Sequence, residues 1–422
     1  MGNSLGLDLV TEADVVGCPD CGTLQTVPPL QAREVFLCCV CDIELERKTG
    51  RNLDVALAFS LATVLFLLAA NALPILTASA LGARRQSYLI SGVGSMWSLD
   101  WPSLAVAIAL VIIVLPLIRF GLLTFVLASL KLGWRPPILG RLFLVSSWLK
   151  MWAMPDVLLL ALWVAYARLS ATVDTMLEPG AYFLIAAGLC ALLTRATLDR
   201  QDVWRALPIS GPIVAEPCAV GSLGGVPEMA CHSCELVLPR SYVGRPCPRC
   251  GSRVRTRVRG SVEIAIALTA AGVLLYIPAN LYAMATIPIG LHPTSYNVLG
   301  GVIDLLDAHL LGLALLVFTA SFAIPFCKLA GLSWCLLSVV TRSKRFLRTK
   351  TRVYRVIEEI GRWSMVDPLV IALFVPVTRF NTVISSSAGP AAPFFTAVVV
   401  LTMISANLFD PRLMWDAARK KL

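Results

Sequence analysis

The chain is poor in the residues that soluble enzymes use for catalysis. Charged residues make up only 15% of its 422 positions, and it has three histidines. It lacks the glycine-rich loop with a lysine that cradles nucleotide phosphates, so we do not expect ATP to drive any process from within this chain. No nucleophile is paired with a base, and no short apolar stretch at the start has the form of a cleavable secretion signal. These absences argue against an enzyme.

Hydrophobic residues are abundant instead, at 57% of the chain, and the mean hydropathy of +0.77 is far above that of a soluble domain. A helix that spans a bilayer needs about 20 predominantly apolar residues. Eight stretches come close to this length or exceed it, which predicts an all-α polytopic membrane protein with eight transmembrane helices. These stretches are 55–79, 103–130, 143–167, 181–198, 264–287, 310–338, 365–384 and 394–409.

Four Cys-x2-Cys elements have the spacing of zinc-ribbon ligands. Two such elements can place four thiolates tetrahedrally around one Zn²⁺, and Gly22 and Gly251 suit the turn that follows a second ligand. The first cluster has one thiol too many; we choose Cys38, which keeps the two-residue spacing, over Cys39. Because four thiolates leave no open coordination position, we predict two structural zinc sites rather than catalysis. The predicted ligands are Cys18, Cys21, Cys38, Cys41, Cys231, Cys234, Cys247 and Cys250.

The second half of the chain repeats the first with an offset of about 209 to 211 residues. Each copy has a cysteine cluster followed by four apolar stretches, with unusual polar residues at matching positions. We therefore predict a tandem duplication, in which each half is a small zinc ribbon followed by a four-helix transmembrane bundle. The predicted units are 1–50 (first ribbon), 51–205 (first bundle), 206–260 (linker and second ribbon) and 261–422 (second bundle).

Lysine and arginine are concentrated in alternate loops, which orients the chain by the positive-inside rule. Both termini and both ribbons are therefore predicted to lie in the cytosol, where thiols stay reduced and zinc binding is favoured over disulfides. The basic stretch 253–259 directly precedes a membrane helix, so we expect contact with anionic lipid headgroups and not with nucleic acid. The basic segments are 131–150, 239–260 and 341–362, whereas 169–180, 289–307 and 385–393 contain no lysine or arginine.

Several polar residues recur inside the apolar stretches, where they are costly and usually face a partner or water. Each cation follows a proline by three residues, so we predict a helix kink beside it and pairing with an aspartate of the next helix. Structural pairing and a role in substrate passage or energy coupling have equal weight, and the two asparagines are expected to bridge helices. These residues are Arg119 and Lys328, Pro116 and Pro325, Asp156 and Asp367, and Asn71 and Asn280.

The two cations differ in a way that bears on function. Arginine stays charged under almost all conditions, whereas a buried lysine can lose its proton. If either half handles protons or a movable anion, the half with Lys328 and Asp367 is the better candidate.

Three motifs of the second half resemble the paraquat-inducible protein A family. They are Gly-Arg-Trp-Ser-Met-Val-Asp at 361–367, Ile-Pro-Phe-Cys-Lys-Leu at 324–329 and Phe-Asp-Pro-Arg-Leu-Met-Trp-Asp at 409–416. The duplicated four-thiolate module with four helices is also that family's architecture, and the resemblance extends from Cys18 to Asp416. The first half departs from the second in places, with Ala153-Met-Pro155 where the second half has Ser364-Met-Val366.

The resemblance implies an inner-membrane protein that loads or unloads phospholipid for a periplasmic tunnel partner with a mammalian-cell-entry (MCE) domain. Lys328 or Arg119 could then contact a headgroup phosphate. Two other functions remain open. One is a membrane redox or stress sensor based on the zinc thiolates, and the other is an iron–thiolate membrane oxidoreductase.

Overall fold

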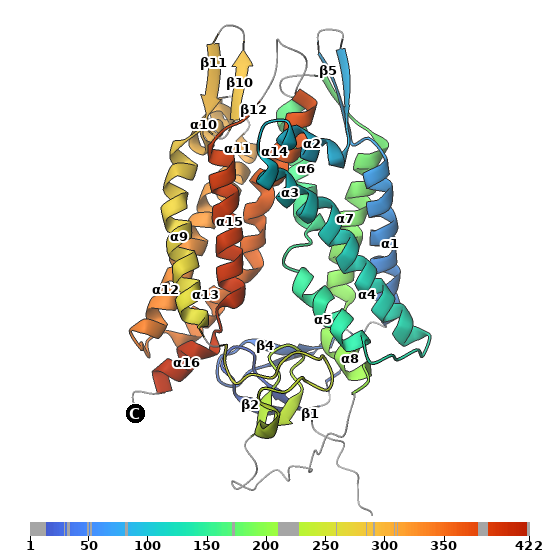
Figure 1. Cartoon of the computed structure of the whole chain (residues 1–422), viewed down its shortest axis with the longest axis vertical. Helices are drawn as coiled ribbons and strands as arrows, with labels where there is room; N and C mark the ends of the chain where they lie inside the picture. Colours follow the sequence, from blue (N-terminus) through green and yellow to red (C-terminus); the bar gives the residue numbers. More distant parts are fainter. Residues whose placement is uncertain are drawn as a thin grey trace, which may run out of the picture.

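The computed structural model of the chain is mostly helical, with short strands at both ends of the helical body (Figure 1). The three-stranded sheets lie at one end, and the cysteine-rich segments lie at the other. The residues that the structure describes are 14–28, 30–31, 34–48, 50, 53–80, 83–170, 174–209, 228–258, 260–283, 285–289, 292–307, 309, 311–378 and 387–419.

The first half contains two cysteine-bearing hairpins, a helical body and a short terminal helix. Its elements are β1 (Asp14–Gly17), β2 (Leu24–Val27), β3 (Val35–Leu37), β4 (Glu44–Arg47), α1 (Leu53–Ala72), β5 (Leu76–Ala80), β6 (Ala83–Ser87), α2 (Leu89–Trp97), α3 (Pro102–Ala109), η1 (Leu110–Val114), α4 (Leu115–Lys131), α5 (Leu139–Leu149), α6 (Pro155–Ser170), β7 (Asp174–Leu177), α7 (Pro179–Thr197) and α8 (Arg200–Ala206).

The second half repeats this order, which fits the predicted duplication. Its elements are β8 (Glu228–Ala230), β9 (Val237–Pro239), η2 (Arg240–Tyr242), α9 (Ser261–Leu281), β10 (Ala285–Ile289), β11 (His292–Tyr296), α10 (Val298–Asp307), α11 (Leu311–Phe318), η3 (Thr319–Ala323), α12 (Ile324–Val340), α13 (Leu347–Ile360), η4 (Gly361–Met365), α14 (Val366–Thr378), β12 (Ser387–Ala388), α15 (Ala391–Leu408) and α16 (Arg412–Arg419).

Six helical segments within the described residues are long and apolar enough to cross a membrane, three in each half. Their outer faces carry exposed large apolar side chains, such as Leu65 on α1 and Leu274 on α9. In an aqueous protein such patches would be unfavourable, whereas lipid tails solvate them. The protein is therefore a multi-pass membrane protein. The spans are Leu53–Ala72, Pro102–Lys131, Pro179–Thr197, Ser261–Leu281, Ala314–Val340 and Ala391–Leu408.

The third apolar stretch of the first half is not one continuous helix, so that part of the sequence prediction is wrong, whereas α14 follows the corresponding stretch of the second half from Val366 to Thr378. In the first half α5 ends at Leu149, and α6 begins at Pro155, whose ring and missing N–H do not allow one helix to run through. In the second half α13 passes through the 3₁₀ turn η4 into α14. Since α6 and α14 are shorter than a bilayer-spanning helix, the eight-helix arrangement stays a prediction.

A second difference is that the protein is not purely α-helical. The first stretch was expected to stay helical to residue 79, but α1 ends at Ala72 and the chain turns into a three-stranded antiparallel sheet. In that sheet β5 pairs with both β6 and β7, and in the second half β10 pairs with β11 and β12. These strands lie in the loops that are poor in lysine and arginine, at the end opposite the cysteines (Figure 1).

The second span of each half contains one proline that follows a π-helical turn. The N–H of Leu115 bonds to the carbonyl of Leu110, and that of Ile324 bonds to the carbonyl of Thr319. Such a turn carries one extra residue, which makes room for the ring of the proline that follows, Pro116 or Pro325. The irregularity predicted at these prolines is thus a π-helical turn.

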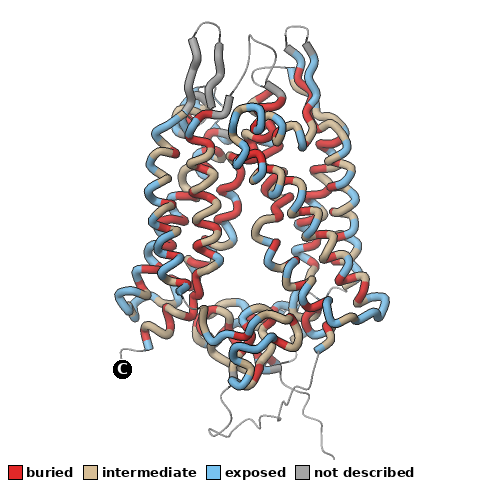
Figure 2. The backbone as a smooth tube through the Cα atoms, viewed as in Figure 1, coloured by how far each residue is buried: buried red, intermediate tan, exposed pale blue. Residues whose placement is uncertain are grey.

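The two halves share one apolar core. Helix α14 of the second half packs against α6 and α2 of the first half. Leu158 and Leu162 belong to the same buried cluster as Leu369 and Leu373, and buried residues recur along the helical body (Figure 2). The broken third segments therefore form the joint between the halves.

Candidate functional site

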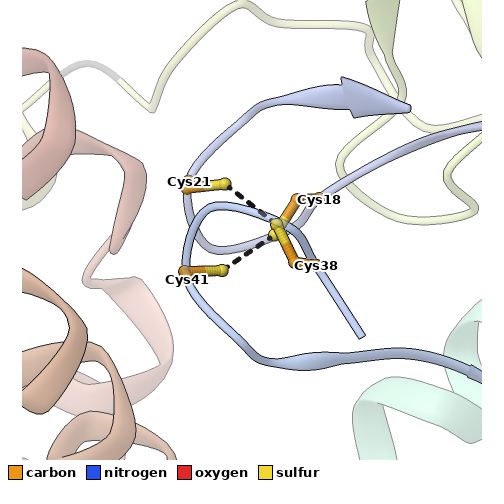
Figure 3. Close-up of side chains that lie close together, drawn as sticks. All are labelled: Cys18, Cys21, Cys38 and Cys41. Atoms are coloured by element: carbon orange, nitrogen blue, oxygen red, sulfur yellow. Dashed lines mark hydrogen bonds between the residues drawn. The ribbon is translucent and has the colours of Figure 1, made fainter. Parts of the chain in front are cut away.

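The first cysteine cluster is a four-thiolate site at the tips of two hairpins. All four sulfurs point toward one another (Figure 3) and lie within 4.8 Å of each other. The Sγ atoms of Cys18 and Cys41 are 3.5 Å apart, and those of Cys21 and Cys38 are 3.6 Å apart. Cys38 is buried in the cluster, whereas Cys39 is exposed outside it.

The second cluster has the same geometry. Its four cysteines are buried, with Sγ distances of 3.8 Å between Cys231 and Cys250 and 3.6 Å between Cys234 and Cys247. Four sulfurs bound to one Zn²⁺ at ~2.3 Å in a tetrahedron lie about 3.8 Å apart, so both clusters fit a tetrahedral metal ion. The eight predicted ligands therefore form two sites able to hold metal.

Each cysteine pair is part of the same tight turn, and the residue after the second cysteine always has a left-handed backbone. The φ angles are 75° at Gly22, 58° at Asp42, 62° at Glu235 and 72° at Gly251. Its N–H bonds back to the carbonyl of the first cysteine, at 2.8 to 3.0 Å. Glycine adopts this conformation without a steric cost, so the turns at Gly22 and Gly251 could be predicted from the sequence. In the other two turns Asp42 and Glu235 adopt the same left-handed conformation.

The first ribbon, defined here as residues 14–48, docks its cysteine turns on the second half of the chain. Asp20, which lies between two ligands and is fully buried, accepts two hydrogen bonds from Arg355 of α13, at 2.6 and 2.9 Å. Burial alone would lower the pKa of Arg355, but the carboxylates of Asp20 and Glu358 more than offset this and raise it. Arg412 of α16 donates to the carbonyl of Pro19, and Trp415 packs in the cysteine cluster.

The second ribbon, defined as residues 228–254, docks on the first half. Its cysteines share a buried cluster with Trp204 of α8 and Phe143 of α5. Arg249, which lies between two ligands, stacks over the ring of Trp204 at 5.6 Å and donates to the carbonyl of Cys234. Arg200 of α8 donates to the carbonyl of Ser233 at 2.8 Å. The cysteine turns are therefore exchanged between the halves.

The flanks of the ribbons also bind their own halves. Arg205 of α8 forms two hydrogen bonds with Glu46, and Arg257 forms two with Asp416 of α16, which raise the pKa of Arg257. The ribbons also contact each other, because β1 packs on β8 and β9. They form one unit across the end of both helical bodies (Figure 1).

The two intramembrane cations bind backbone carbonyls at the breaks in the third segments. Arg119 donates from Nη1 to the carbonyl of Ala153 at 2.9 Å, and Lys328 donates from Nζ to the carbonyl of Gly361 at 3.4 Å. Gly361 is the C-cap residue of α13, and because a helix C-terminus carries a partial negative charge, Lys328 stabilises that end.

The aspartates do not pair with the cations as expected. Asp156 forms its ion pair with Arg362 of the other half, at 3.9 Å, and among the described residues no ion pair joins Lys328 to Asp367. Oδ2 of Asp367 is buried without a hydrogen-bond partner.

The asparagines also differ from expectation, because the hydrogen bonds of their side-chain amide nitrogens stay within one helix. Nδ2 of Asn71 donates to the carbonyl of Leu67 at 2.7 Å, and Nδ2 of Asn280 donates to that of Tyr276 at 2.8 Å. Both bonds stabilise the last turn of a membrane helix just before its sheet.

A group of charged residues at the joint was missed by the sequence reasoning. Glu359 of α13 forms ion pairs with Lys150, at 3.7 Å, with Arg362, at 2.9 Å, and with Arg195 of α7. Lys150 and Glu359 are about half exposed. Lys150 was read only as part of the basic segment 131–150, Arg195 was not singled out, and only the tertiary fold brings them to the second half.

The chain is similar to a family model and to several bacterial proteins along most of its length. The family model described as "Paraquat-inducible protein A" matches residues 53–208 and 262–419, the helical body of both halves. The "Intermembrane transport protein PqiA" of Escherichia coli (strain K12) is 29% identical over 403 residues, covering 94% of this chain and 95% of the relative. The "Lipophilic envelope-spanning tunnel protein A" of the same strain is 26% identical, covering 96% and 92%. A "Probable intermembrane transport protein" of Haemophilus influenzae is 27% identical, covering 95% of each. No solved structure matches the chain.

Proposed function

Because the chain belongs to the paraquat-inducible protein A family, we propose that it is a non-enzymatic component of an intermembrane lipid-transport system. In this proposal it lies in the inner membrane of a bacterium and loads or unloads phospholipid for a periplasmic tunnel partner with an MCE domain. The observation that carries the proposal is the near-full-length similarity to two proteins that are named for intermembrane transport.

The distribution of charge supports an orientation with the ribbons in the cytosol. The basic loops 131–150 and 341–362 lie at the ribbon end of the helical body, and the sheets at the other end contain few lysines and arginines. Short cytosolic loops of membrane proteins are enriched in these residues. The sheets would then face the periplasm, where a tunnel partner would dock, and the eight apolar segments would place both termini in the cytosol.

The cysteine sites support structural zinc. Each ribbon is too small to form a stable core of its own, and metal binding would supply the missing folding free energy. Four thiolates around one ion leave no position for a substrate, which disfavours chemistry at the metal. The buried carboxylate of Asp20 and the cation of Arg249 tie the sites to the helices, so the ribbons would clamp the two halves at the cytosolic end.

The proposal is tested by following labelled phospholipid between the two membranes of Escherichia coli that lacks both of its relatives. We expect lipid exchange to rise when this chain is produced together with its own MCE-domain partner, and not when either is produced alone. Unchanged exchange with both proteins present in the correct membranes would reject the transport function.

Two further measurements test the alternative functions, the iron–thiolate oxidoreductase and the redox or stress sensor. Metal analysis of the purified protein should find two zinc ions per chain. Iron in place of zinc would favour the oxidoreductase. Mild thiol oxidation should leave lipid exchange unchanged, because closed zinc–thiolate sites are protected. A change in lipid exchange that occurs only after thiol oxidation would favour the sensor.

A further inference from the structure

The joint between the halves contains an apolar pocket. It has a volume of about 320 Å³ and lies between η1 of the first half and η4, α14 and α15 of the second half. Its walls include Leu110, Val111, Trp148, Trp152, Met365 and Leu369. Leu110 and Trp148 are 42% and 57% exposed, so the pocket opens at the surface of the helical body. This volume is at the lower end of ligand sites and suits one narrow apolar chain.

The charged group described above adjoins this pocket. Lys150 lies between the wall residues Trp148 and Trp152, and Arg362 lies one helical turn before the wall residue Met365. Arg119, Lys150, Arg195 and Arg362 gather there, and the carboxylates that form ion pairs with them among the described residues are those of Asp156 and Glu359, while the nearby Glu358 forms its ion pair with Arg355. The group therefore has two more positive than negative charges, and it suits an anion.

Two hydrogen-bond donors, one on a wall residue of the pocket and one on a charged residue, have no partner. The indole Nε1 of Trp152 and Nε of Arg119 are both buried and unpaired. Unpaired buried donors are costly, and a site that binds an oxyanion is a common reason for keeping them. They belong to the two segments that already meet through the bond from Arg119 to the carbonyl of Ala153.

We propose that this joint is the binding site for one phospholipid, with an acyl chain in the apolar pocket and the headgroup phosphate at Lys150, Arg362 and the Trp152 indole. This inference rests on the proposed transport function and names where in the chain the lipid binds. Arg195 lies in the last turn of α7 and Arg362 precedes α14, so these two charges lie on the ribbon side of the walls formed by α14 and α15, which matches a lipid of the cytosolic leaflet. A phosphate oxygen would accept charge-assisted hydrogen bonds there, while the tail stays in apolar surroundings.

The site is tested by photocrosslinking in membranes that contain radiolabelled phosphatidylglycerol and phosphatidylethanolamine. A benzophenone amino acid replaces Trp148 in the pocket or Trp163, which is 63% exposed on the outside of α6, as a matched control. After detergent purification we expect labelled lipid at position 148 and at least about fivefold less at position 163. In the first variant, Lys150→Ala should lower labelling about tenfold and Lys150→Arg should restore it, as for loss of one charge-assisted hydrogen bond.

The control for charge is Lys131→Ala, because Lys131 has a similar exposure, forms an ion pair with Asp54 at 2.9 Å and lies away from the joint. It should leave labelling at position 148 unchanged. Equal labelling at the two positions, or labelling that ignores Lys150→Ala, would overturn the site while lipid exchange by the whole protein could still stand.

Competition separates a lipid headgroup from free phosphate. Unlabelled phosphatidylglycerol should displace the label, whereas diacylglycerol and millimolar inorganic phosphate should not. Displacement by inorganic phosphate alone would make the charged group a free-phosphate site and overturn the proposal.

Discussion

The two halves build the same break in their third segment with different residues. In the first half Lys150 precedes the break and Arg119 reaches a carbonyl inside it; in the second half Gly361 stands at the position of Lys150, and Lys328 reaches its carbonyl. A Cβ on Gly361 would lie 2.9 to 3.2 Å from the side chain of Lys328, so glycine is what allows the lysine this close. In the second half the cation Lys328 is buried, whereas in the first half the cation Lys150 is about half exposed.

The two ribbons differ in the contacts that hold them on the opposite half. The first ribbon packs on Trp415 of the second half and also forms ion pairs with it, those of Asp20 with Arg355 and of Asp42 with Arg348 and Arg352. The second ribbon is held on the first half by the buried ring of Trp204 and by close backbone contact. A Cβ on Gly140 of α5 would lie 1.9 Å from the carbonyl oxygen of Arg249. Similar folds have thus been docked with a contribution from charge in one half and by packing in the other.

The largest effect is expected from removing a metal ligand in one ribbon, because zinc supplies on the order of 10 kcal/mol to such a fold. Cys250→Ser should leave one zinc per chain and should increase amide exchange in α5 and α8 of the first half. Cys41→Ser should leave one zinc as well, but should increase exchange in α13 and α16 of the second half. Exchange that rises only within the half that carries the substitution would contradict the crossed docking.

The next effect compares the two intramembrane cations. Lys328 is 3% exposed and forms one long hydrogen bond, to the carbonyl of Gly361. Lys328→Ala should therefore remove both a buried positive charge and this bond. We expect at least about a tenfold loss of lipid exchange. Arg119→Lys keeps the charge and should cost less than about twofold. The measurement is exchange at equal protein level in the membrane, and an unaffected Lys328→Ala variant would exclude a coupling role for Lys328.

Much of the fold could be predicted because its signals are local. The spacing of Cys18 and Cys21 alone was enough to predict that they join a cluster able to hold metal, and six of the eight apolar stretches form membrane-length helices. The short strands β5 and β6 were missed because Ala, Ser and Arg at these positions do not form a strand pattern. Asp156 was assigned a partner in its own half, because sequence adjacency was the only guide. Its partner Arg362 lies 206 positions away, and only the packing of α14 on α6 brings them together.

The smallest effect separates docking by charge from docking by packing. Asp20→Asn removes a bidentate pair with Arg355, but Arg355 is about a third exposed, so the first ribbon should be destabilised on the second half by only about 1 kcal/mol. High salt should mimic this change, because it screens partly exposed charges. The matched change in the other ribbon is Trp204→Phe, whose effect should not depend on salt, since it removes buried contact area. Protease cleavage of each ribbon, measured at low and high salt with zinc present, reports the docking. If both ribbons loosen equally as salt rises, the contrast between their contacts does not govern how they are held.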